Sequence, residues 1–327
     1  MIVASDPVLP KPLAVASGTP VVYTALGAVM HLECLEPDDE GRLAAVNDLV
    51  WDWFGDRLRW MERSFDPQVQ RAQRAESDYI AGYPTMLDVP RTSEPLDQAI
   101  LSAQASVVRD DFEVAFCGGE TAGSASPYSY RFWAETVGAS AGGTRAHAVL
   151  HITVPESWPI DDFRERITAI AASLRLRWAS AGYTYSPWLV SGFEVAGTKM
   201  AAHARRHVGY DIAEYVRLVQ PFHECIRTVN WLTFLGKDMV AKLREKGPLE
   251  SSQQLAIQPV GDSLLVRAGD VPERGDLNRL QYPTAYLEAD ILLRPVRARD
   301  GRDMVFFGPW DEDQITDWLC RFERAVN

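Results

Sequence analysis

The sequence predicts an α+β fold in which an antiparallel or mixed sheet packs against several amphipathic helices. Segments with alternating apolar residues, typical of strands, are interspersed with segments whose apolar residues recur every three or four positions, typical of helices. Glycine- and serine-rich turns separate neighbouring strand segments, as in antiparallel hairpins. The regular strand–helix alternation of a parallel doubly wound fold is missing. These observations together favour α+β.

The N-terminal third begins with an expected extended arm over residues 1–20, which hold four prolines. A strand is predicted over 21–33, where alternate residues share an apolar face. A broad apolar stripe predicts a helix over 37–64. A second helix is expected to open at Pro95.

The middle of the chain changes character after this second helix. Short apolar runs at 112–117, 128–137 and 146–154, separated by Gly/Ser-rich turns, predict three antiparallel strands. A helix follows over 160–180, with acidic residues in its first turn where the helix dipole favours them. A further helix is expected over 197–208.

The C-terminal third is predicted to contain a buried strand over 229–235 and a short helix over 238–246. Gly261-Asp262 joins two apolar runs and predicts a hairpin. Asp311 and Gln314 have the spacing of a capping box, which places the start of the last helix. Strand–helix–strand order at 21–62 and again at 146–190 indicates one domain over 21–327, with two related halves that would be 21–140 and 141–327.

Composition narrows the classes of function. With 46% hydrophobic residues the chain is expected to fold. Its formal net charge of −12 disfavours direct binding to nucleic acid and favours encounter with a basic partner. Neither a signal peptide nor an 18-residue apolar run is recognisable, so we expect a cytoplasmic protein without a membrane segment. The scattered cysteines are expected to be reduced thiols: Cys34, Cys117, Cys225 and Cys320.

A catalytic motif is not recognisable: there is no phosphate-binding loop, no dinucleotide fingerprint and no nucleophile elbow. His203 and His207 are spaced to share one helix face and could bind a metal ion. However, Ala204 occupies the position of the zinc-protease glutamate, and Arg205 and Arg206 would repel a cation. We therefore expect the two histidines to flank the apolar stripe of their helix.

A second histidine pair, His147 and His151, is predicted on one face of a strand. With a carboxylate the pair could form an acid–base device. The more ordinary interpretation is that these histidines lie on a half-exposed strand face.

Acidic residues form four clusters, and three of them fall at predicted helix starts, where capping and the helix dipole favour carboxylates. Only Asp110, Asp111 and Glu113 lack this explanation. They are expected to be surface charges and partner contacts rather than metal ligands. No residue is assigned to a metal or a cofactor.

Further recognisable segments are residues 148–155, 209–212, 226–236 and 306–310, with Trp318 and Phe322. These segments resemble a family of bacterial immunity proteins of type VI secretion systems. The resemblance extends over about residues 20–327.

The resemblance implies a non-enzymatic, cytoplasmic protein that binds and neutralises a nuclease toxin with a restriction-endonuclease-like domain, and that uses no cofactor. An acidic protein suits the basic cleft of a nuclease, and tight binding requires aromatic anchors. Two alternatives stay open: a metal-dependent enzyme using His203 and His207, and an adaptor of the secretion machinery. The interface candidates are Tyr79, Tyr83, Tyr128 and Trp188, with Asp110, Asp111 and Glu113.

Overall fold

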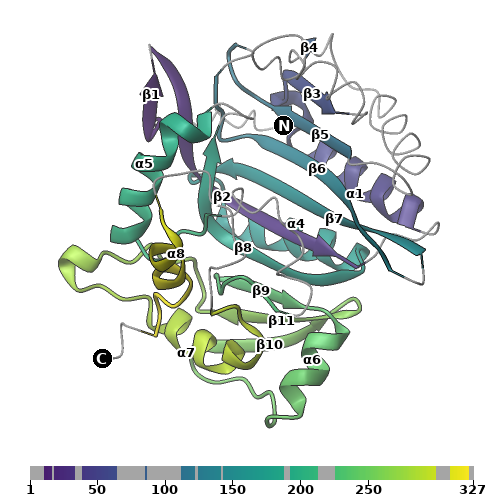
Figure 1. Ribbon diagram of the computed structural model, residues 1–327, viewed down its shortest axis with the longest axis vertical. Helices are drawn as coiled ribbons and strands as arrows, with labels where there is room; N and C mark the ends of the chain where they lie inside the picture. Colours follow the sequence, from purple (N-terminus) through teal and green to yellow (C-terminus); the bar gives the residue numbers. More distant parts are fainter. Residues whose placement is uncertain are drawn as a thin grey trace, which may run out of the picture.

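A single sheet organises the protein. The computed structural model describes residues 11–16, 18–33, 39–64, 85–86, 112–121, 124–140, 143–187, 192–212, 225–299 and 310–323. Within them the sheet has eleven strands: ten follow the order β10-β11-β9-β8-β2-β7-β6-β5-β3-β4, and β1 pairs with β2 off this path (Figure 1). Each of these strand pairings is antiparallel. The predicted α+β class is confirmed, with an antiparallel sheet.

Strand β2 lies at the centre of the sheet, because it pairs with β7 on one side and β8 on the other. The strands are β1 (Ala14–Ala16), β2 (Thr19–Leu32), β3 (Trp60–Ser64), β4 (Thr85–Met86), β5 (Phe112–Cys117), β6 (Ser129–Ser140), β7 (Gly143–Pro155), β8 (Leu176–Pro187), β9 (Leu232–Leu235), β10 (Leu255–Val260) and β11 (Ser263–Ala268).

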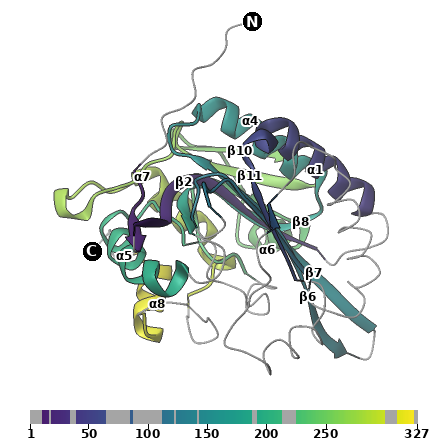
Figure 2. The ribbon, with the colours of Figure 1, turned by 90° about the horizontal axis from the view of Figure 1, so that it is seen from above.

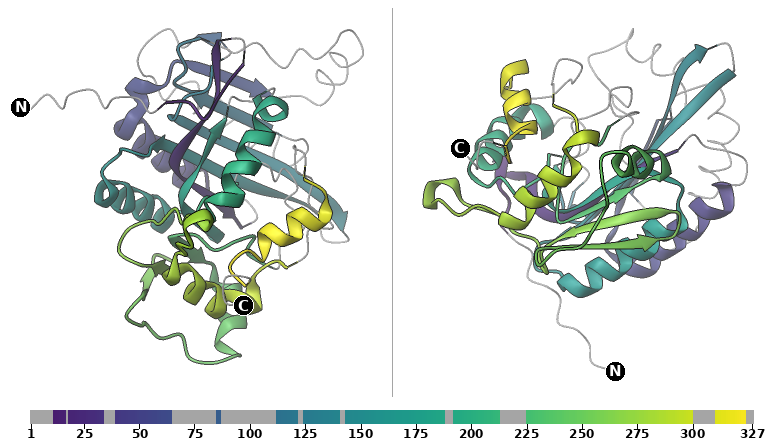
Figure 3. Two further views of the ribbon diagram at one scale, coloured as in Figure 1. Left: turned by 90° about the vertical axis from the view of Figure 1, so that its left-hand side faces the viewer. Right: turned by 90° about the horizontal axis from the view of Figure 1, so that it is seen from below.

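Helices cover both faces of the sheet (Figures 2 and 3). On one face α1 (Asp39–Phe54) and α4 (Ile160–Ser173) lie side by side. The opposite face carries α5 (Gly192–Arg206), α6 (Lys237–Arg244), α7 (Thr284–Leu293) and α8 (Glu312–Leu319). Of the helices described, none has both the length and the apolar character to cross a membrane.

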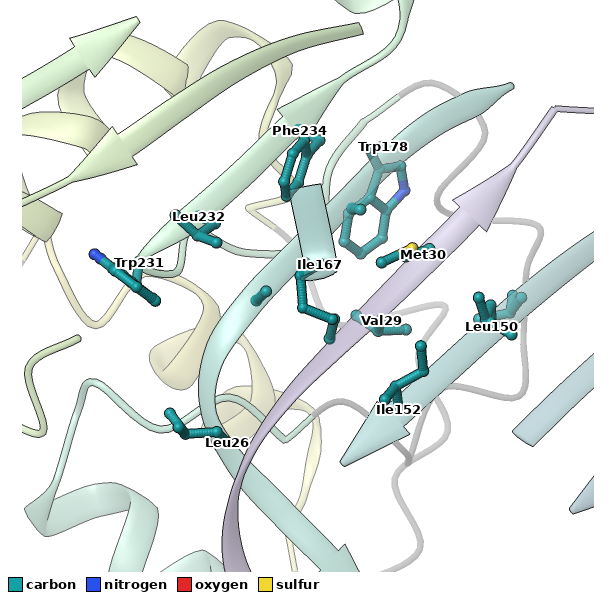
Figure 4. Close-up of a cluster of buried hydrophobic side chains, with 14 of the residues drawn as sticks. Leu26, Val29, Met30, Leu150, Ile152, Ile167, Trp178, Trp231, Leu232 and Phe234 are labelled. Carbon is teal, nitrogen blue, oxygen red and sulfur yellow. The ribbon is translucent and has the colours of Figure 1, made fainter. Parts of the chain in front are cut away.

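The hydrophobic core is continuous across the central strands and α4. Figure 4 shows part of it, with residues from β2, β7, β8 and β9, from α4 and from the position just before β9. Burial of this kind is the main source of stability for such a sheet, at roughly 25 cal/mol per Å² of apolar surface. Its labelled members are Leu26, Val29, Met30, Leu150, Ile152, Ile167, Trp178, Trp231, Leu232 and Phe234.

Two predicted helices are too long. The first ends at Phe54, and residues 60–64 form β3 instead of a last helical turn. The helix predicted over 160–180 ends at Ser173, and its predicted C-terminal part, with Trp178, belongs to β8. Because β8 is buried on both faces, it lacks the polar alternation that marks a strand.

Other predictions are confirmed or fall elsewhere. The hairpin around Gly261-Asp262 is formed by β10 and β11. At the start of α8, Gln314 N donates to Asp311 Oδ1 at 2.9 Å and Asp311 N donates to Gln314 Oε1 at 3.3 Å, so the capping box is confirmed. The helix predicted from Pro95 lies outside the described residues. Strand β1, within the expected arm, and helix α7 were not predicted.

Candidate partner-binding site

The connection between β11 and α7 projects from the body of the protein (Figures 1 and 2), and we call residues 270–283 the projecting loop. Asp276 and Gln281 exchange two backbone hydrogen bonds, at 2.8 and 3.0 Å. Between them Leu277–Arg279 form a single 3₁₀ turn, and the Asp276 side chain accepts a hydrogen bond from Asn278 N at 3.1 Å. The loop therefore closes on itself and has a defined tip.

An ion pair attaches this loop to the end of α5. Arg206 donates from Nε and Nη2 to the two carboxylate oxygens of Asp276, at 3.0 and 2.6 Å. Such a two-point contact fixes the direction of both side chains. The hydrogen bond from Arg206 holds the pKa of Asp276 at about 2. The pair consequently keeps both charges at neutral pH.

His207 and Gly209 hold the backbone of the same loop. His207 Nδ1 lies 2.7 Å from Gly275 O, so this nitrogen carries the proton, since a carbonyl oxygen can only accept. Gly209 N donates to Arg274 O at 2.9 Å. A Cβ atom on Gly209 would lie 1.9 Å from Glu273 O, a distance that no side chain permits. We call Arg206, His207 and Gly209 the loop mount.

A second set of contacts ties the base of the loop to the end of β7. Tyr210 OH donates a hydrogen bond to Glu156, and Arg274 Nη2 donates to the other Glu156 oxygen at 2.8 Å. The Arg274 guanidinium also lies 5.0 Å from the centre of the Tyr183 ring. Burial, reinforced by the Glu156 charge, raises the pKa of Tyr210, so this hydroxyl stays protonated. The loop is therefore attached both to α5 and to the sheet.

His203 lies beside the loop mount. Its Nδ1 and the Tyr185 hydroxyl are hydrogen-bonded at 2.9 Å, and its ring centre lies 4.6 Å from that of His207. Burial, with the charges of His207 and two arginines, lowers the pKa of His203 to about 4. Met200 and Ala204 are buried next to it, so the expectation that the histidines flank an apolar stripe is confirmed. In the part of the chain that the structure describes, no three His, Cys, Asp or Glu residues are grouped to hold a metal ion.

Behind the loop mount lies a buried ion pair. Arg227 donates from Nη2 to Asp211 and from Nη1 to Ile212 O at 2.8 Å. Ser180 Oγ donates to Asp211 Oδ2 at 3.2 Å. Burial lowers the pKa of Arg227, although the Asp211 carboxylate opposes this shift. Segments 209–212 and 226–236, which carry the family resemblance, thus supply the buried pair and part of the loop mount.

Two further buried arginines, Arg297 and Arg321, make contacts in the C-terminal part of the chain. Arg297 Nε lies 2.7 Å from Asp290 Oδ1, and Arg297 Nη1 donates to Leu319 O at 2.7 Å. Arg321 Nε donates to Val208 O at 2.8 Å, directly before Gly209. Burial lowers the pKa of Arg321 to about 10. The turn that carries the loop mount is therefore held by Arg321, in the segment that follows α8.

The other predicted site residues are distributed differently. Tyr128, named from the sequence as an interface candidate, is only 4% exposed and packs against Phe54 and Trp158, so its side chain is not available to a partner. Glu113 lies on β5, and its side chain falls outside the described residues, as do residues Tyr79, Tyr83, Asp110, Asp111 and Trp188.

The strand histidines also differ from the prediction. His151 is fully buried on β7, so the half-exposed strand face expected there is wrong at this position. Within the sheet it lies opposite Val29 of β2 on one side and Arg131 of β6 on the other. The His147 side chain lies outside the described residues.

Of the acidic residues at helix starts, Asp311 caps its helix as predicted, and two others accept hydrogen bonds from side chains. Asp162, in the first turn of α4, accepts hydrogen bonds from Trp158 Nε1 at 2.6 Å and from Arg166 Nε at 3.0 Å. Asp39, at the start of α1, accepts from Arg175 Nε at 3.1 Å. Asp311 caps α8. Each of these three carboxylates therefore has a partner within the chain.

Comparison with known proteins identifies the family. A family model described as type VI immunity for VRR-NUC matches residues 88–322. The chain belongs to this immunity family. It is similar in structure to the Pseudomonas aeruginosa T6SS protein PA0821, with a TM-score of 0.70 and 18% identity over 97% of this chain and 90% of that chain. No curated protein matches the chain. The family predicted from the sequence is thereby confirmed.

Proposed function

We propose that this chain binds a VRR-NUC nuclease effector of a type VI secretion system and neutralises it without catalysing a reaction. The observation that carries the proposal is the family match over residues 88–322. That range contains the projecting loop, the loop mount and the buried pair of Arg227 and Asp211. We infer a stoichiometric complex rather than turnover.

Charge supports a nuclease as the partner. A nuclease presents a basic surface to the phosphate backbone, and this chain carries a formal net charge of −12. Complementary charge raises association rates to ~10⁸–10⁹ M⁻¹s⁻¹ at low salt. A nuclease acts where nucleic acid is, so its antidote is needed in the cytoplasm. The interface proposed from the sequence contains Asp110, Asp111, Glu113, Tyr79, Tyr83 and Trp188, while Tyr128 is removed from it by its burial.

The metal-enzyme alternative would use His203 and His207. His207 Nδ1 is engaged with Gly275 O and His203 Nδ1 with Tyr185, an arrangement that a metal-binding histidine can also have. Among the residues that the structure describes, no third His, Cys, Asp or Glu is grouped with them as a metal site requires. The immunity-family match favours a binding protein over a metal enzyme or an adaptor.

Titration of nuclease activity tests the proposal. The VRR-NUC effector encoded beside the gene is mixed with increasing amounts of this chain, and DNA and RNA cleavage are measured. Inhibition that is complete at a fixed molar ratio is expected, with a nuclease of another family left unaffected. Full inhibition by far less than one equivalent would indicate an enzyme, and binding without inhibition would indicate an adaptor.

A further inference from the structure

The tip of the projecting loop presents an exposed leucine in an unusual conformation. Leu280 has φ 55° and ψ 32°, and in the described part of the chain it is the only non-glycine residue with positive φ. A bulky side chain rarely adopts this left-handed conformation. At 76% exposure it is also the most exposed large hydrophobic residue described. Folding therefore places an apolar side chain in water at a strained position.

The rest of the loop explains how this conformation persists. Leu280 N donates to Leu277 O at 3.1 Å, inside the turn closed by Asp276 and Gln281. Asp276 is fixed in turn by Arg206 of the loop mount. Strained residues persist where their surroundings over-determine them, and they gather at functional sites. Leu280 is thus held outward rather than left free to collapse onto the surface.

The chemistry around the leucine is that of an interface anchor with a polar rim. Asn278, Arg279 and Gln281 are exposed around it. The Arg279 side chain is 72% exposed, although its Nε lies 3.7 Å from Asp276 Oδ2. Val271, near the start of the projecting loop, is 55% exposed. The projecting loop therefore holds two of the five exposed large hydrophobic residues described.

We infer that the tip of the projecting loop, residues 278–281, anchors the nuclease effector by inserting Leu280 into an apolar pocket that is flanked by a carboxylate. The inference rests on the proposed function and adds a contact surface to it. Arg279 would pair with the carboxylate. Arg279 is the one charged residue of the tip, so the tip suits an acid-rimmed pocket of the effector better than a phosphate-binding surface. A pre-ordered anchor also lowers the entropic cost of binding.

Affinity measurements on single variants test the inference. The dissociation constant for the purified VRR-NUC effector encoded beside the gene is measured by calorimetry for the wild-type chain, Leu280→Asp and Ile291→Asp. Leu280→Asp is expected to weaken binding by at least ~100-fold, the size of a central hot spot. Its Tm should not fall, because Asp enters the left-handed conformation more readily than Leu. Ile291→Asp, the matched exposed control, should leave the dissociation constant within about threefold.

A second variant tests whether the ion pair that positions the loop tip contributes to binding. Arg206→Ala keeps Leu280 but removes the ion pair that holds Asp276, and it should weaken binding by about tenfold, mainly through faster dissociation. If wild type binds and Leu280→Asp binds equally well, the anchor is wrong and the proposed function stands. If wild type does not bind the effector, both are overturned. The wild-type chain could instead form a dimer that Leu280→Asp dissociates while effector binding stays unchanged. That result would assign the tip to self-association and overturn the inference.

Discussion

Two ion pairs involve neighbouring residues of the chain, Arg206 and Asp211, but one pair is partly exposed to solvent and the other is buried. Asp211 and Arg227 have side chains only 2% and 1% exposed. In the other pair, Arg206 is 44% exposed and Asp276 is 9% exposed. An exposed pair is worth about 0–1 kcal/mol, whereas breaking a buried pair costs about 3–5 kcal/mol. The comparison separates what holds the fold from what positions the projecting loop.

The buried pair should give the largest effect on stability. Arg227→Met leaves the Asp211 carboxylate buried without its main partner and should lower the free energy of unfolding by about 3–5 kcal/mol. Urea denaturation followed by tryptophan fluorescence measures this loss.

The matched control for that variant is the double substitution Asp211→Leu with Arg227→Met. Removing both charges replaces the pair by apolar groups, which is often neutral, so most of the lost stability should return. A double variant as unstable as Arg227→Met would show that the hydrogen bonds to Ile212 O and from Ser180, and not the ion pair, carry the effect.

A substitution at Gly209 tests how the projecting loop is attached, and its effect on stability should be intermediate. Gly209→Ala places a methyl group against the backbone carbonyl of Glu273, so the loop must shift away from its mount. Overpacking of this kind costs about 1–3 kcal/mol. Hydrogen exchange read by mass spectrometry should show faster exchange in residues 270–283 and little change in the central strands.

Gly41→Ala is the control for that substitution. Gly41 lies in α1, and an added Cβ would meet nothing within 4 Å. Alanine there should stabilise the protein by about 0.5–1 kcal/mol, because glycine is a poor helix former. If Gly209→Ala were equally harmless, the close approach between Gly209 and the loop would not be essential.

The same contrast shows what the sequence could and could not predict. Local patterns predicted the capping box of Asp311 and Gln314, the hairpin of β10 and β11, and the position of His203 and His207 beside an apolar stripe. Each of these features depends on residues close together in the chain. The Arg206–Asp276 pair joins residues 70 positions apart, and nothing local to either residue signals the other.

Strand β8 and helix α7 show a second limit. Strand β8 is buried on both faces and its apolar residues also fit a helical spacing, so the pattern alone misassigned Trp178. Helix α7 is mostly apolar and has no side-chain cap at Pro283, which removes the usual start signal. The projecting loop could not be predicted, because leucine is usually a core residue. Nothing in the sequence around Leu280 signals that its side chain is exposed at the tip of a loop.

The last expected effect concerns pH and His203. Its pKa is about 4 in the folded protein, against an ordinary value of 6.5. Between these values the unfolded chain binds a proton that the folded protein does not, so folding stability should fall as pH decreases from about 6.5 to about 4. His203→Gln keeps a hydrogen-bonding partner for Tyr185 and removes this titration, so its stability should fall less over the same range.

Asp276, with a pKa of about 2, stays charged and paired with Arg206 in this range, so a difference between wild type and variant reports His203 and not the ion pair. Parallel urea denaturation curves at pH 7 and pH 4.5 measure it, and identical losses in both proteins would show that His203 is not kept neutral by its burial against the loop mount.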